Sequence, residues 1–92
     1  MGFFNSSVKS HLLNLLGGMN GAMRIMQNSS GECNTAHWQY AACSGSVHGI
    51  CFALNLNEEK IKVDGCDDEG LFLMETLSEK EFMDKYWMGV KA

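Results

Sequence analysis

The residues best suited to chemistry in this sequence are Cys43 and His48, which flank the short run of residues 44–47. A histidine beside a cysteine can lower the pKa of the thiol and so make the sulfur a better nucleophile. If the chain turns at residues 44–46, the two side chains lie side by side on paired strands. No third residue to orient the imidazole is identifiable. A thiol- or metal-dependent enzyme that uses Cys43 and His48 is therefore the alternative interpretation and not the preferred one.

Metal binding is not indicated by the cysteines or by the acids. The four cysteines contain no C-x2-C pair, which zinc ribbons and thioredoxin-like sites use. His48 and Cys51 are three residues apart, and in a strand that offset places them on opposite faces. Phosphate-binding loops, nucleophile elbows and H-E-x-x-H motifs are also missing. We therefore expect no catalytic residues, no metal and no cofactor.

The negative charge of the chain is concentrated in its C-terminal third. Seven Lys and Arg stand against eleven Asp and Glu, a net charge of −4. Residues 58–92 contain five lysines and ten acids, a net of −5, whereas residues 1–57 carry +1. Without a basic stripe, direct nucleic-acid binding is not expected. Clustered carboxylates could instead imitate phosphates and engage a basic groove on a protein partner. The acids assigned to this role are Glu58, Glu59, Asp64, Asp67, Asp68 and Glu69.

These residues must be positioned by one small domain over residues 1–92, because two cores would each be too small to be stable. The best-patterned element is a helix that follows an N-cap serine at positions 6–7. Gly17, Gly18 and Gly21 lie inside it and cost about 1 kcal/mol each relative to alanine. These glycines predict that the helix packs closely against the sheet. The apolar stripe of this helix is Val8, Leu12, Leu15, Leu16, Met19, Ala22, Met23 and Met26.

After the first helix the apolar residues alternate with a period of two, which is typical of strands. Gly45 and Ser46 suit a two-residue hairpin turn, since glycine occupies its first central position. A second turn at residues 57–60 leads to a third strand, and a loop between Asp64 and Gly70 leads to a fourth. The four predicted strands cover residues 35–43, 47–56, 61–63 and 71–77.

Trp38 and Tyr40 lie on the same face of the predicted sheet. The opposite face is aliphatic and is assigned to the first helix, so the two aromatic side chains point away from that helix. They form an exposed patch of the kind that marks protein interfaces, unless the C-terminal helix covers them with Phe82 and Trp87. The aliphatic face consists of Ile50, Phe52, Leu54 and Leu56.

The clearest local signal is the capping box that begins at Ser78 and includes Glu81. Leu77 precedes it and can contact Phe82 as a hydrophobic staple, and Gly89 can terminate the helix as its C′ residue. The predicted fold class is therefore α+β, in the order α-β-β-β-β-α. It consists of a four-stranded antiparallel sheet with an N-terminal and a C-terminal helix.

We expect a non-enzymatic, acidic protein-binding module that works in the cytoplasm with reduced cysteines. The chain is similar in size and charge alone to small inhibitors such as anti-CRISPR and toxin-immunity proteins. That likeness implies an inhibitor of a basic nucleic-acid-handling or toxin protein.

Two further interpretations concern self-association and membranes. A homodimer through the aromatic patch is left open. No run of about 18 apolar residues is present, so no membrane-spanning helix is expected. Peripheral membrane contact through Phe3 and Phe4 is a third option, which the small number of basic residues on the first helix disfavours.

Overall fold

Four helices account for the regular structure in the described part of the chain. The computed structural model describes residues 2–30 and 32–89, with side chains from Val8 onwards. No strand occurs in these residues, where only two isolated bridges join Leu56 to Trp87 and Cys66 to Phe72. The predicted α+β class with a four-stranded sheet is therefore wrong, and the fold is all-α. The helices are α1 (Gly2–Asn28), α2 (Asn34–Leu54), α3 (Glu58–Asp64) and α4 (Glu79–Tyr86).

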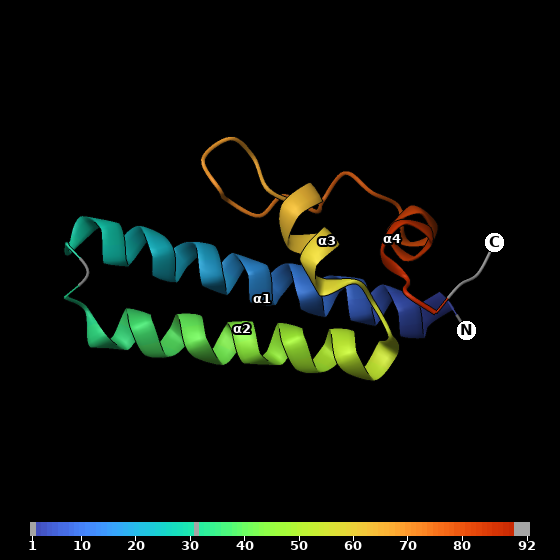
Figure 1. Cartoon of the computed structure of the whole chain (residues 1–92), viewed down its shortest axis with the longest axis horizontal. Coiled ribbons are helices and arrows are strands. Elements are labelled where there is room, and N and C mark those ends of the chain that lie inside the picture. The colour runs from blue at the N-terminus through green and yellow to red at the C-terminus, as the bar shows by residue number, and fades with distance from the viewer. Residues whose placement is uncertain (1, 31, 90–92) are drawn as a thin grey trace.

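The first helix is confirmed, and it forms an antiparallel hairpin with α2 (Figure 1). It begins at Gly2, so the serines at positions 6–7 lie inside the helix and are not its N-cap. Its apolar residues recur every three or four positions, which gives one buried stripe. The fully or nearly fully buried members are Val8, Leu12, Leu16, Met19 and Ala22.

Helix α2 replaces the first two predicted strands, and the predicted turn at Gly45 and Ser46 lies in its middle. The residues facing the core recur at helical spacing, which the alternating pattern concealed. The opposite side of α2 is also apolar or small, so a period of two fits the sequence nearly as well as a period of 3.6. The inward-facing residues are Ala36, Tyr40, Cys43, Val47, Ile50, Cys51 and Leu54.

The two long helices approach each other closely at Gly18. A Cβ atom added there would lie 2.8 Å from Sγ of Cys43. The side-chain amide of Gln39 also donates a 2.8 Å hydrogen bond to the backbone carbonyl of Gly18. A Cβ at Gly17 would meet nothing within 4 Å. The predicted close packing is therefore found at Gly18, although the first helix packs against helix α2 and not against a sheet.

The third and fourth predicted strands are also absent. The third lies within α3, and Asn57, predicted to be in a turn, is the N-cap that accepts a hydrogen bond from the backbone N–H of Lys60. The segment predicted as the fourth strand is irregular and is held against α1 by the side-chain amide of Asn20. That amide exchanges two hydrogen bonds with the backbone of Phe72, at 3.1 and 3.3 Å.

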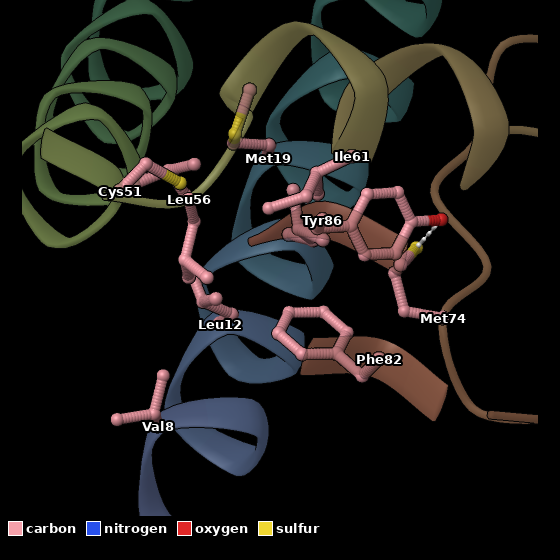
Figure 2. Packing of buried hydrophobic residues seen from close by; sticks show 11 residues of the cluster. Val8, Leu12, Met19, Cys51, Leu56, Ile61, Met74, Phe82 and Tyr86 are labelled. Carbon is pink, nitrogen blue, oxygen red and sulfur yellow. Dashed lines mark hydrogen bonds between the residues drawn. The ribbon is translucent and has the colours of Figure 1, made fainter. Parts of the chain in front are cut away.

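The C-terminal helix begins as predicted. Ser78 and Glu81 make both hydrogen bonds of the capping box. The helix ends at Tyr86, and Trp87 has an extended backbone, so Gly89 is not the C′ residue. Its buried residue Phe82 lies near Leu12 of α1 (Figure 2). Helix α4 therefore covers α1 and not the surface that contains Trp38.

Candidate functional site

The outer side of α2 exposes two large aromatic residues. Trp38 is 76% exposed and Phe52 is 83% exposed. Tyr40 is half-buried and packs against the core. It points away from Trp38 because residues two positions apart on a helix are turned about 200° from each other. The structure therefore separates the two aromatic residues that sequence reasoning had placed together. It adds Phe52, which had been assigned to the aliphatic face.

Small residues connect Trp38 to Phe52 along the helix. Neither Asp, Glu, Lys nor Arg occurs in the 21 residues of α2. We call the exposed stripe the outer face of α2. It occupies about 100° of the helix, directly opposite the stripe that faces α1. Its members are Trp38, Ala41, Ala42, Gly45, Gly49 and Phe52.

A pocket of about 540 Å³ opens at the C-terminal end of this face. Helix α2 ends there because Asn55 adopts a left-handed conformation with φ 58°. Asparagine tolerates this conformation better than most residues. The N–H of Leu56 then bonds back to the carbonyl of Cys51 at 2.8 Å. The lining residues are His48, Cys51, Phe52, Asn55, Leu56, Asn57, Glu58, Glu59 and Met88.

An ion-pair cluster borders the pocket at the start of α3. Nδ1 of His48 lies 2.7 Å from Oε1 of Glu58, and Nζ of Lys62 lies 2.9 Å from Oε2. Partial burial acts to raise the pKa of the Glu58 carboxyl. The hydrogen bonds and charges of Lys62 and His48 outweigh burial and lower that pKa. Sequence reasoning missed this cluster, because it predicted a turn where α3 begins.

The proposed reactive pair, Cys43 and His48, is not brought together. Cys43 is half-buried against Gly18, whereas the His48 side chain is 70% exposed. His48 and Cys51 do line one pocket, because an offset of three places residues on one side of a helix and not on opposite sides. Burial and the charge of Glu58 raise the pKa of the Cys51 thiol to about 11, which disfavours the thiolate. No group of three or more metal-ligating side chains occurs among the described residues.

The six candidate acids lie at opposite ends of α3 and not in neighbouring turns of a hairpin. Glu58 and Glu59 form its first turn. Asp64 is at the other end, 3.8 Å from Nζ of Lys85. Asp67 accepts two hydrogen bonds at 2.9 Å from backbone N–H groups of its own loop. Two of these carboxylates are thus paired with cations and a third holds a turn. The exposed acids of the loop are Asp68 and Glu69.

The chain matches no model of a known protein family and no solved structure. No helix in the described part of the chain is both long enough and apolar enough to cross a membrane. The side chains of Phe3 and Phe4, considered for membrane contact, lie outside the described ones.

Proposed function

We propose that this protein is a non-enzymatic protein-binding module whose docking site is the outer face of α2. One observation carries the proposal: a helix of 21 residues without Asp, Glu, Lys or Arg has one side packed on α1 and large aromatic side chains exposed on the other. Large apolar side chains on a helix normally face a core or a partner. Within the described residues nothing covers Trp38 and Phe52, which are 76% and 83% exposed.

The matching surface is an uncharged apolar stripe on a helix of another protein chain. An ionic partner would find no counter-charge on α2, so recognition rests on shape and apolar contact. Tryptophan is the residue type most often responsible for binding energy at interfaces. Burying a large apolar side chain completely contributes about 1.5–3 kcal/mol. Trp38 and Phe52 are thus the anchors of the site.

The setting that fits the proposal is the reducing cytoplasm. All four cysteines are described, and none forms a disulfide. Reduced cysteines are the rule in that compartment. The inhibition of a basic partner through the acids of α3 and its loop stays a prediction, since Glu58 and Asp64 already pair with lysines.

Site-specific photo-crosslinking in cells tests the docking site. A benzophenone side chain is introduced at Ser46, at the edge of the outer face, and as a control at Asp68 in the exposed loop. We expect a covalent adduct with a protein from position 46 and none from position 68. The adduct should disappear when Trp38→Ala and Phe52→Ala are added. Equal adducts from both positions, or an adduct that survives both substitutions, would contradict the proposal.

A further inference from the structure

Five of the six residues of the outer face of α2 are arranged symmetrically about Gly45, and the sixth, Ala42, pairs with His48. Trp38 and Phe52 lie seven residues before and after Gly45, and Ala41 and Gly49 lie four before and after it. When two copies of one helix pack antiparallel around a twofold axis at Gly45, positions pair if their numbers add up to 90. Trp38 then meets Phe52 of the other copy, Ala41 meets Gly49, and Gly45 meets itself. Large residues meet at both ends and small ones at the crossing.

The pocket borders the outer face of α2 at Phe52. His48, Cys51, Phe52 and Asn55 line one side of the 540 Å³ pocket. His48 and Phe52 lie on α2, Asn55 is its left-handed C-cap, and Cys51 belongs to the side of α2 that faces the core. The pocket therefore lies on the flank of α2, beside Phe52, the residue that Trp38 meets in the antiparallel pairing.

The glycines of the outer face are not required by any close approach within the described chain. A Cβ at Gly45 or at Gly49 would meet nothing within 4 Å, in contrast to Gly18. Glycine is unfavourable inside a helix, so packing within the chain does not account for these two residues. At a crossing between two helices, they allow the axes to approach to about 8 Å.

Charge also favours a second copy over an ionic partner. The chain has a net charge of −4, so two copies repel each other over most of their surface. The excess lies in residues 58–92, at −5, whereas residues 1–57 carry +1. Helix α2 carries no Asp, Glu, Lys or Arg. Its outer face is therefore a surface on which two acidic copies can meet without repulsion.

We infer that the protein forms a symmetric homodimer in which two α2 helices pack antiparallel at Gly45 and each Trp38 packs against Phe52 of the other copy. This inference rests on the proposed docking site and names its occupant. The largest exposed apolar patch on a single chain typically covers roughly 300–600 Å². That area lies at or below the range of stable complexes. The dimer is therefore reversible, with a Kd on the order of 10 µM.

Sedimentation of the full chain between about 1 and 500 µM tests the dimer, a range that brackets the expected Kd. The mass should rise from 10.2 kDa towards twice that value. Trp38→Ala should weaken association at least ~10-fold. Gly45→Leu should abolish association, because the larger side chain separates the helices. Gly17→Leu, at another glycine with nothing within 4 Å of its Cβ, is the matched control and should leave the dimer unchanged. Circular dichroism checks that each variant is folded.

Cysteine crosslinking tests the direction of the helices. Oxidation by copper phenanthroline should join two copies of Gly45→Cys, because position 45 faces itself. Ala41→Cys alone should give no more product than the wild-type chain, because position 41 faces position 49. Equal crosslinking at both positions would indicate parallel helices and overturn the inference.

The mass of the chain at high concentration separates the two proposals. A mass of 10.2 kDa throughout, or a dimer indifferent to Trp38→Ala and Gly45→Leu, rejects the homodimer. If the crosslinker at position 46 still labels another protein in that case, the docking site stands and its occupant is a different chain. If it labels nothing, both proposals fail.

Discussion

The hairpin of α1 and α2 and the segment with α3 and α4 reach helical structure by different means. The short helices have local signals: Asn57 and Ser78 accept hydrogen bonds as N-caps, and acids occupy the first turns. Helix α2 has no side-chain cap bond and contains two interior glycines, at 45 and 49. Packing of one face on α1 must therefore stabilise it, because local propensity alone is marginal. Local capping signals therefore specify α3 and α4, whereas packing between distant parts of the chain stabilises α2.

The largest expected effect is at Leu12, where the two regions meet. Leu12 is fully buried in the core cluster with Val47 of α2 and Phe82 of α4. Leu12→Ala should lower the free energy of unfolding by about 2–5 kcal/mol, through lost burial and a new cavity. Ile25→Ala, at a site 46% exposed, is the control and should cost far less. Urea unfolding measures both; similar values would show that Leu12 does not join the two regions.

The next effect concerns the approach of α1 to α2. Gly18→Ala should destabilise the protein by about 1–2 kcal/mol, because the new Cβ meets Sγ of Cys43. Gly17→Ala should stabilise it by about 0.5–1 kcal/mol, since its Cβ meets nothing. Thermal unfolding distinguishes the two signs. Adding Cys43→Ala should restore most of the loss from Gly18→Ala, and failure to do so would place the conflict elsewhere.

A local signal is tested at the capping box. Ser78→Ala removes the hydroxyl that accepts from the N–H of Glu81 at 3.1 Å. We expect a loss of about 1 kcal/mol, measured as a lower urea midpoint. Ser78→Asp should restore most of it, because aspartate is also a good N-cap. An unchanged midpoint in Ser78→Ala would mean that α4, like α2, depends on packing alone.

A smaller effect is expected at Glu58, as a dependence on pH. Its pKa in the folded chain is lowered below the ordinary value of 4.5 by the hydrogen bonds of Lys62 and His48, despite partial burial. A lowered folded-state pKa stabilises the protein above the unfolded-state pKa, and this contribution disappears as the pH falls through the folded-state value. Glu58→Gln should therefore reduce the loss of stability between about pH 5 and pH 3. Glu59→Gln is the matched control. An identical acid profile in both variants would argue against the ion pairs.

The smallest effect on stability is expected for the exposed acids of the loop. Asp68→Lys with Glu69→Lys should change the free energy of unfolding by less than about 0.5 kcal/mol, as for most surface substitutions. Asp67 is kept, because its carboxylate holds the loop backbone. The double variant isolates the predicted contact with a basic partner. Unchanged binding to such a partner would remove these two acids from the interface.

The candidate site was only partly predictable. Trp38 was expected to face away from the first helix, and it is exposed, although it lies on a helix and not on a strand. Tyr40 was paired with it because a period of two was assumed, and it lies on the other side. Phe52 was missed for the same reason. The absence of Asp, Glu, Lys and Arg from 34 to 54 was the signal that could have indicated a helix with apolar residues on two opposite sides.

The sequence by itself determined α1 and the start of α4. The stripe from Val8 to Ala22 and the hydrogen bonds of Ser78 with Glu81 involve residues within a few positions of each other. Such local patterns can be read without knowledge of the fold. Only the tertiary structure decided that residues 34–54 form one helix, because Gly45 and Ser46 permit a turn equally well. Packing against the apolar stripe of α1 selected the helix, and that packing left the opposite side of α2 as the exposed face.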